Sequence, residues 1–207
     1  MKKHILFTAL ILGSLFSFAQ INKGQWLAGG NIVYSYQQFS SFNTSTTTVS
    51  GFRIPVNVGY FVKDRLAIGT RSSYSRLESQ IKYKDNGNWY TTNKDLNIQY
   101  NTGVFVRYYM LPVTSKINFL LDGSYAYGFN TSSTTLLDNN DIYRKMNSSA
   151  NTGTYQLSMG PALFLNKNIS LEFLIGYSHT SFYNSSSISS NMFSTGLGLQ
   201  IHLGQGK

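Results

Sequence analysis

Cysteine is absent from the 207-residue chain, and charged residues make up only 12% of it. Without cysteine, neither a disulfide framework nor a thiolate metal site can stabilise the fold. The mean hydropathy of −0.17 excludes a bundle of membrane-spanning helices. Aromatic and small residues are abundant instead, with 15 Tyr, 14 Phe and 18 Gly. Abundant tyrosine and glycine with little charge favour β structure.

The first residues have the pattern of an export signal. Lys2 and Lys3 form a basic start, residues 5–16 form an apolar run, and Ser17 to Ala19 place small residues where a signal peptidase cuts. The apolar run is short for a helix that must span a bilayer, and no cysteine follows it to carry a lipid. We therefore expect a cleaved signal peptide at 1–19 and one mature domain at 20–207.

Eight segments alternate in residue character with the period of two that is typical of a strand. In one of them, for example, Leu96, Ile98 and Tyr100 share a face. The predicted strands are 26–37, 52–60, 66–74, 96–108, 119–127, 155–163, 169–177 and 193–203. Pro55 and Pro161 fall inside two of these strands, where a missing N–H interrupts the ladder, so we expect a β-bulge at each.

The links between these strands alternate in length. Short links lie at 63–65, 111–116 and 166–168, whereas long polar links lie at 38–50, 76–95, 131–152 and 180–191. A soluble sandwich has no reason to place all its short turns at one end. A transmembrane barrel does, because it has short periplasmic turns, longer external loops and an even number of strands. The sequence therefore predicts an all-β fold, an eight-stranded antiparallel up-and-down transmembrane β-barrel.

Charge placement supports the same fold. The charged residues inside the predicted strands all lie on the face opposite the apolar set, namely Arg53, Arg71, Arg107, Asp122 and Glu172. A charge facing lipid at mid-bilayer costs about 2 to 4 kcal/mol for Arg or Lys, so the uncharged face is the one that meets lipid. A soluble eight-stranded barrel would show the reverse, with an apolar interior and charges outside. Aromatic residues at the strand ends, including Trp26, Tyr60, Tyr108 and Phe164, are interpreted as membrane girdles, although strict alternation places Phe164 on the inward face.

Four of the inward charges are expected to meet in the lumen. Arg71, Arg107, Asp122 and Glu172 lie at similar distances from the short turns, so we predict one mixed ion-pair network. Buried charges persist only when they are paired and hydrogen-bonded. Glycines in the same register, such as Gly59 and Gly69, would make room for large neighbours. A structural plug is the favoured interpretation, and a gate or a proton path is the alternative.

Several motifs together resemble those of a known family. They are the signal ending Phe18-Ala19-Gln20, the hairpin from Gly59 to Gly69, the strand end Val106-Arg107-Tyr108-Tyr109, and a closing strand with Ser194, Gly196, Leu199 and Ile201. The mature chain resembles the small outer-membrane β-barrel proteins of the OmpX and OmpA-transmembrane-domain type, especially those of Bacteroidetes. The resemblance implies insertion by the barrel-assembly machinery through the C-terminal strand, although here that strand ends at Leu203 rather than at an aromatic residue.

One pair of residues suggests an enzyme. His179-Thr180-Ser181 resembles the His-x-Ser of the outer-membrane lipid A deacylases, in which acyl transfer needs a nucleophile, a base and a group that orients the base. His179 and Ser181 share the lipid-facing register. No Asp or Glu follows Glu172, however, and Phe182 replaces the Asn that follows the Ser in that family. We therefore predict no enzymatic activity and no cofactor or metal, and keep a lipid A acyl hydrolase as a minor alternative.

The remaining evidence for function lies in the long polar links. Two of them combine charge with aromatic residues, and the candidates for recognition are Trp89, Tyr90, Tyr143 and Arg144. We expect an envelope-structural or adhesion-type surface protein of a Gram-negative outer membrane, and the alternative is a narrow solute pore. Its expected partners are outer-membrane lipid and lipopolysaccharide, the assembly machinery and an extracellular ligand. Nucleic acid is not expected, because the links supply no basic face.

Overall fold

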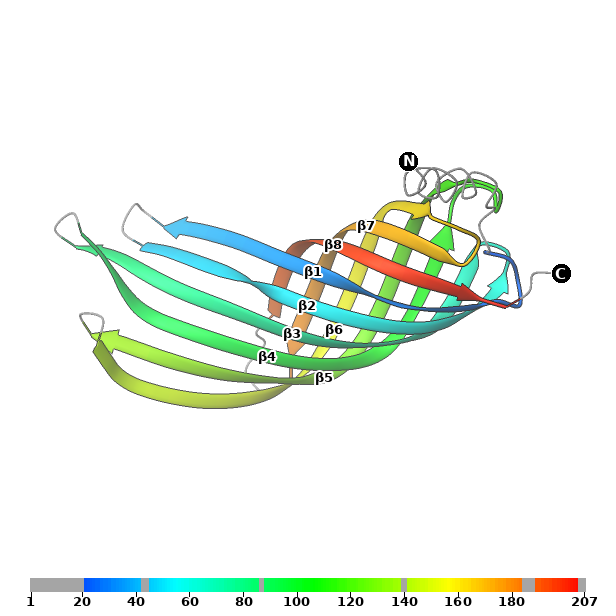
Figure 1. The fold of residues 1–207 in the computed structure, drawn as a ribbon. Coiled ribbons are helices and arrows are strands. Elements are labelled where there is room, and N and C mark those ends of the chain that lie inside the picture. Colours follow the sequence, from blue (N-terminus) through cyan, green and yellow to red (C-terminus); the bar gives the residue numbers. More distant parts are fainter. Residues whose placement is uncertain (1–20, 42–44, 86–87, 139–140, 184–188, 205–207) are drawn as a thin grey trace, which may run out of the picture.

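The computed structural model describes residues 21–41, 45–85, 88–138, 141–183 and 189–204 (Figure 1). The predicted signal peptide at 1–19 therefore lies outside the described residues. Long strands dominate the described part of the chain. They are β1 (Trp26–Ser41), β2 (Ser45–Lys63), β3 (Leu66–Asp85), β4 (Asn88–Tyr109), β5 (Ile117–Asp138), β6 (Asp141–Phe164), β7 (Ile169–Phe182) and β8 (Ser189–Leu203).

The strands form a closed barrel in sequence order, and each pair of neighbours is antiparallel. The ring closes where β1 pairs with β8, from Trp26↔Leu203 to Tyr34↔Thr195. Within the described residues, no helix is long and apolar enough to cross a membrane. Closure leaves each backbone polar group of the ring with a neighbouring strand to pair with, which a lipid environment requires. The predicted eight-stranded antiparallel transmembrane barrel is confirmed.

The two faces of the barrel differ as the alternation predicts. Ile32, Val104 and Leu197 are 64%, 57% and 68% exposed and belong to the outer face. The intervening residues, such as Asn31 and Val33, are buried in the lumen. Trp26, Tyr60 and Tyr108 lie on the outer face near the short turns, as expected of a girdle. The girdle assignment of Phe164 is wrong, because its side chain is fully buried inside the barrel.

The long polar links are largely strand rather than loop. β3 and β4 pair from Leu66↔Tyr108 out to Asp85↔Asn88, and β5 and β6 pair as far as Asp138↔Asp141. The predicted strand ends in these hairpins are therefore wrong by about a dozen residues in places. Hydroxyl-rich segments such as 131–135 carry little apolar signal, yet their backbone groups pair across the hairpin. Polar strands outside a bilayer need no apolar face.

The extended hairpins form a six-stranded sheet that stands above the closed ring. In Figure 1, the hairpins β1–β2, β3–β4 and β5–β6 reach far beyond the outer ends of β7 and β8. Pairing between β6 and β7 starts at Thr152↔Phe182, and pairing between β1 and β8 stops at Tyr34↔Thr195. Among the described strands, none pairs with the outer side of β1 at 35–41 or of β6 at 141–150. We call this assembly the protruding sheet, and these two segments its free edges.

The bulges expected at the prolines are not present. β2 and β3 keep one register through Pro55↔Ser73, and β5 and β6 keep one register through Phe119↔Pro161. Each proline instead interrupts the pairing on its other side. The β1–β2 ladder stops at Gly30↔Val56 and resumes at Val33↔Arg53 without a shift. A missing donor thus costs local pairing but not register, because the flanking strands on both sides hold the alignment.

The short-turn end of the barrel is closed by residues 21–25. The backbone N–H of Arg65 donates to the carbonyl of Ile21 at 2.7 Å, and that of Phe61 donates to the carbonyl of Gln25 at 2.9 Å. Ile21 and Gln25 are fully buried as a result. A layer of aromatic side chains fills the lumen at this end, made up of Phe61, Tyr109, Phe164 and His202. Phe61, Tyr109 and Phe164 belong to the buried apolar cluster of the lumen, which also includes Ile21, Leu27, Ala67, Phe105, Leu120, Ala162 and Leu174.

Candidate functional site

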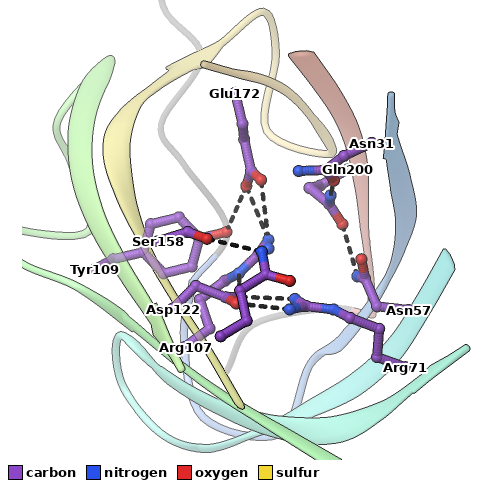
Figure 2. Close-up of polar contacts among 10 residues, drawn as sticks. Asn31, Asn57, Arg71, Arg107, Tyr109, Asp122, Ser158, Glu172 and Gln200 are labelled. Atoms are coloured by element: carbon purple, nitrogen blue, oxygen red, sulfur yellow. Dashed lines mark hydrogen bonds and ion pairs between the residues drawn. The ribbon is translucent and has the colours of Figure 1, made fainter. Parts of the chain in front are cut away.

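The four predicted lumen charges meet in one network, which Figure 2 shows at the centre of the barrel. Arg71 binds Asp122 with two hydrogen bonds, from Nη1 to Oδ1 at 2.7 Å and from Nη2 to Oδ2 at 2.8 Å. Arg107 donates from Nε to Asp122 Oδ2 at 2.9 Å and from Nη1 to both oxygens of Glu172 at 2.9 and 3.1 Å. Tyr109 adds a hydroxyl donor to Glu172 at 3.2 Å. Two arginines and two carboxylates thus form a chain across the lumen.

The strands place these side chains by register and by the small size of their neighbours. Arg107 on β4 lies directly opposite Asp122 on β5. Glu172 on β7 has Ala162 on one side and Gly198 on the other, which leaves room for Arg107 to reach it across the lumen. The network therefore joins strands that are not neighbours in the ring.

Phe105 occupies the space beneath the two guanidinium groups. The guanidinium carbon of Arg71 lies 4.8 Å from the centre of the Phe105 ring, and that of Arg107 lies 5.8 Å from it. Cations at these distances are attracted to the ring face. Gly59 makes the ring's position possible, because a Cβ there would come within 2.8 Å of Phe105 Cζ. The inward glycines of the sequence are therefore needed for the packing around the charges.

Because the network is buried, each of its charges depends on its partners for stabilisation. Arg107 is 0% exposed, and Asp122 and Glu172 are each 1% exposed. Removing charges from water costs several kcal/mol per ion, and only close partners with good geometry offset this cost. With its members paired, the network satisfies the polar interior and fixes which strands face one another. With one member missing, it leaves an uncompensated charge in a site that water cannot readily enter.

A second polar chain, which the sequence analysis did not single out, lies beside the first. Gln200 accepts a hydrogen bond from Asn57 at 2.9 Å and donates one to Asn31 at 3.0 Å. Gly198 is required for this chain, because a Cβ there would approach Asn31 Oδ1 to 2.6 Å. In the sequence, this chain is indicated by the inward register of Asn31, Asn57 and Gln200. The same register also places Tyr109 and Phe105 on the lumen side.

Open space in the lumen shrinks sharply from the outer end inward. An outer cavity of about 260 Å³ lies above the network. Beneath it are voids of about 20 and 10 Å³, one beside Arg53 and Arg71 and one beside Arg71 and Asp122. A void of about 10 to 15 Å³ holds a single water molecule at most. The lumen is therefore filled at the level of the charges, and it is filled again below them by the aromatic layer.

The four recognition candidates lie on two separate hairpins. The backbone of Trp89 and Tyr90 pairs with β3, near the tip of the β3–β4 hairpin. Arg144 pairs with Leu136 on β5 and is exposed, and Tyr143 falls at a register shift in that hairpin. The side chains of Trp89, Tyr90 and Tyr143 lie outside the described part of the structure. Backbone pairing between the two hairpins extends outward as far as Asn93↔Leu136.

His179 and Ser181 are hydrogen-bonded, and Asn191 completes the group. Ser181 Oγ lies 3.3 Å from His179 Nε2, and His179 Nδ1 lies 2.7 Å from Asn191 Oδ1. The Tyr177 hydroxyl donates to the same Asn191 oxygen at 2.9 Å. An amide oxygen only accepts, so the Nδ1 proton belongs to the histidine, and Nε2 is left to accept from Ser181. The sequence motif leads one to expect a carboxylate in the orienting position, and the structure places Asn191 there instead.

The closed ring, the apolar outer face and the filled polar lumen together define a small transmembrane β-barrel. The model of the outer membrane protein beta-barrel domain matches residues 5–200. The chain belongs to this family, which confirms the resemblance to small outer-membrane barrels and places the protein in the outer membrane.

The chain is similar to several solved structures at low sequence identity. A major outer membrane protein from Thermus thermophilus is 13% identical, with a TM-score of 0.50 over 88% of this chain and 100% of that one. Neisserial surface protein A is 13% identical, with a TM-score of 0.47 over 87% and 97% of the two chains. The attachment invasion locus protein Ail of Yersinia pestis is 11% identical, with a TM-score of 0.45 over 87% and 99%. None of the curated proteins matches the chain.

The network generates a prediction for stability. Asp122→Asn leaves Arg71 without its buried counter-charge and weakens Arg107, so the free energy of unfolding should fall by about 3 to 5 kcal/mol. Glu172→Gln should cost less, because Arg107 keeps Asp122. Urea unfolding of the refolded protein in lipid vesicles measures both effects.

The exposed pair between Arg76 and Glu78 is the matched control. Their side chains are 46% and 54% exposed and 2.9 Å apart. Glu78→Gln should change the unfolding free energy by less than about 1 kcal/mol. If Asp122→Asn costs no more than this control variant, the network does not hold the barrel together.

Proposed function

We propose that this outer-membrane barrel is an envelope-structural or surface-interaction protein that recognises its partners through the protruding sheet. The observation that carries the proposal is the pair of free edges at 35–41 and 141–150, where the described pairing of β1 with β8 and of β6 with β7 has ended. An edge strand presents unpaired backbone N–H and C=O groups to any extended chain that comes alongside. Strand addition of this kind is a common mode of peptide recognition.

The two free edges differ in charge. The β6 edge carries Asp141, Arg144 and Lys145, whereas the β1 edge, SYQQFSS, carries no charge. Charged side chains are the usual protection of an edge against unwanted pairing. The uncharged β1 edge is therefore the better docking strand. Specificity belongs to the hairpins at 76–95 and 131–152, which carry Trp89, Tyr90, Tyr143 and Arg144, residue types that anchor interfaces.

The proposal extends to export and assembly. The mature protein begins at Gln20 after the signal at 1–19 is cleaved, and the assembly machinery recognises the closing strand β8 (Ser189–Leu203). The barrel then sits with its short turns in the periplasm and the protruding sheet outside, where lipopolysaccharide surrounds it. The girdle residues Trp26, Tyr60 and Tyr108 are suited to the periplasmic lipid interface.

The alternative of a narrow solute pore has weaker support. A pore needs a continuous water-filled path, and the voids of about 20 and 10 Å³ around Arg71 leave no such path at the level of the network. The aromatic layer below adds a second obstruction. The filled lumen favours a protein that acts at its outer surface.

A second candidate function rests on His179, Ser181 and Asn191. A nucleophile bonded to a base, which is in turn bonded to an orienting amide, is the arrangement of Cys-His-Asn and Ser-His-Asp hydrolases. The group lies at the outer end of β7 on the lipid-facing register, so its substrate would be an acyl ester of an outer-leaflet lipid. Among the described residues, the backbone N–H groups beside Ser181 belong to the strand ladder, so none of them is placed to stabilise an oxyanion. For this reason we rank the hydrolase second.

Because the lumen is filled, we expect the protein not to conduct ions across a bilayer. The purified protein in planar bilayers should give no stable ohmic current, because no water-filled path crosses the network. Asp122→Asn should not open one, since the aromatic layer remains. Large and steady single-channel currents from the unaltered protein would instead establish the pore.

The free edge predicts a charge-sensitive interaction. Gln38→Lys places a charge on the uncharged edge and should reduce adhesion of expressing bacteria to cell monolayers or extracellular matrix at least tenfold. Thr48→Lys is the matched control, because Thr48 lies directly opposite Gln38 but is paired with Gln80 on its other side. It adds the same charge at the same height without touching a free edge.

Removal of the hairpin tips gives an independent test of the same proposal. Deletion of 80–94 or of 132–148 should leave the barrel folded, as judged by heat-modifiable gel mobility, and should abolish adhesion. Undiminished adhesion of both deletion variants would show that the hairpins carry no recognition.

The hydrolase candidate is tested on its own substrate class. Mass spectrometry of lipid A from cells with and without the protein should show identical acyl chains if the protein is not an enzyme. Loss of an acyl chain that requires His179, Ser181 and Asn191 would reverse the ranking. His179→Ala, Ser181→Ala and Asn191→Ala separate such a loss from an indirect effect of expression.

A further inference from the structure

The outer lumen contains a cavity that is distinct from the ion-pair network and faces inward from the free edges. It has a volume of about 260 Å³ and lies between the network and the protruding sheet. Its wall is rich in hydroxyl and amide groups, among them those of Ser75, Asn97, Gln99 and Asn130. Leu77, Phe182 and Met192 add an apolar surface. This mixture of apolar wall and converging polar groups is typical of a small-molecule site.

Arg53 lines this cavity and has no counter-charge. The carboxylates of Asp122 and Glu172 form ion pairs with Arg71 and Arg107. Among the described residues, no carboxylate lies within ion-pair distance of Arg53, and no hydrogen bond joins it to another side chain. Arg53 also lines the same void of about 20 Å³ as Arg71, so its nearest charged neighbour has the same sign. The inward face of the barrel thus carries one cation more than its anions balance at this depth.

An anion entering from outside would relieve this imbalance. Arg53 is half-buried, and a guanidinium group removed from water without a partner is costly. Its planar fork matches a carboxylate or sulfate, which it binds with two parallel hydrogen bonds. The cavity opens toward the protruding sheet, whereas the filled network closes it on the other side. The ligand would therefore bind and not pass through.

Asp95 offers a ligand in this cavity a buried hydrogen-bond acceptor. This residue also lines the cavity, and its Oδ1 atom is buried and accepts no hydrogen bond within the described residues. Arg53 pairs with Ser75 on β3 and Asp95 pairs with Ser79, so the two positions lie about 13 Å apart along the strand. Asp95 therefore does not neutralise Arg53. It can instead accept a hydrogen bond from a ligand hydroxyl nearer the mouth.

We propose that the outer cavity is a binding site for an acidic saccharide, whose carboxylate or sulfate binds Arg53 and whose hydroxyl groups meet the polar wall and Asp95. The hydroxyl-rich lining and the apolar patch suit a sugar ring better than a bare inorganic anion. The site lies inside the lumen, and Ser35 is the one residue of the free edges that lines it. Its existence is independent of the surface interaction proposed above, and either proposal can fail without the other.

The test is a saturation-transfer NMR titration of the full mature chain in detergent micelles with D-glucuronate. The unaltered protein should bind glucuronate at least tenfold more tightly than D-glucose, which lacks the carboxylate. Arg53→Gln should weaken glucuronate binding at least tenfold and leave glucose unchanged. Because Arg53 has no ionic partner to lose, this variant should fold, and its heat-modifiable gel mobility checks that it does.

Arg76→Gln is the matched control, since it removes the same charge from an exposed arginine outside the cavity. It should bind glucuronate as the unaltered protein does. Equal binding of glucuronate to Arg53→Gln and to the unaltered protein would overturn the site. Inorganic sulfate that binds as tightly as glucuronate would overturn the saccharide assignment. Both results leave the adhesion experiments on Gln38 and the hairpins unaffected.

Discussion

The structure depends on one constraint: a backbone that crosses lipid must pair all its polar groups within the protein. Eight strands satisfy it by closing β1 onto β8. Closure then fixes the side-chain positions, because each residue of the ring faces either lipid or lumen. A narrow ring leaves an interior that side chains can fill. The buried charges, the inward glycines and the aromatic layer all follow from filling that interior.

The lumen is filled by two kinds of side chain, apolar ones that need only close packing and charged ones that also need partners. The aromatic layer of Phe61, Tyr109 and Phe164 fills it with apolar surface, at the end where residues 21–25 close the barrel. Above it, Arg71, Arg107, Asp122 and Glu172 fill it with charges that must be paired. An apolar filling would often be as stable as a buried ionic one. Unlike the apolar layer, the ionic filling specifies which strands face one another, because each carboxylate accepts hydrogen bonds only from partners on particular strands.

Most of the fold could be predicted from local patterns. Alternation identified the membrane-spanning part of each strand, and it placed Arg71, Arg107, Asp122 and Glu172 on one face. The outer halves of the hairpins could not be predicted this way, because segments such as 131–138 are rich in hydroxyl residues and show little apolar alternation. The prediction of a β-bulge at each proline was wrong for a related reason. The register at Pro55 is held by the ladder to β3, which sequence patterns do not reveal.

The candidate sites show where sequence patterns stop being informative. Register indicated that the four charges face inward, but the partner of each charge depends on small neighbours such as Ala162 and Gly198, which lie on other strands. Asn191 orients His179 from a strand that is adjacent only in the folded barrel. Arg53 was recognised as an inward charge. That no carboxylate among the described residues pairs with it emerges only when the pairing of the other four is known.

The seam between β1 and β8 has a consequence for the order of folding. It is the shortest line of pairing in the ring, since it spans only Trp26 to Tyr34, whereas β5 and β6 pair along more than twice that length. It also joins the two strands that are farthest apart in the chain, so its formation carries the largest loss of chain entropy. The seven hairpin contacts can therefore zip up as a curved sheet before the circle closes. The same seam is the line along which the finished barrel opens most readily.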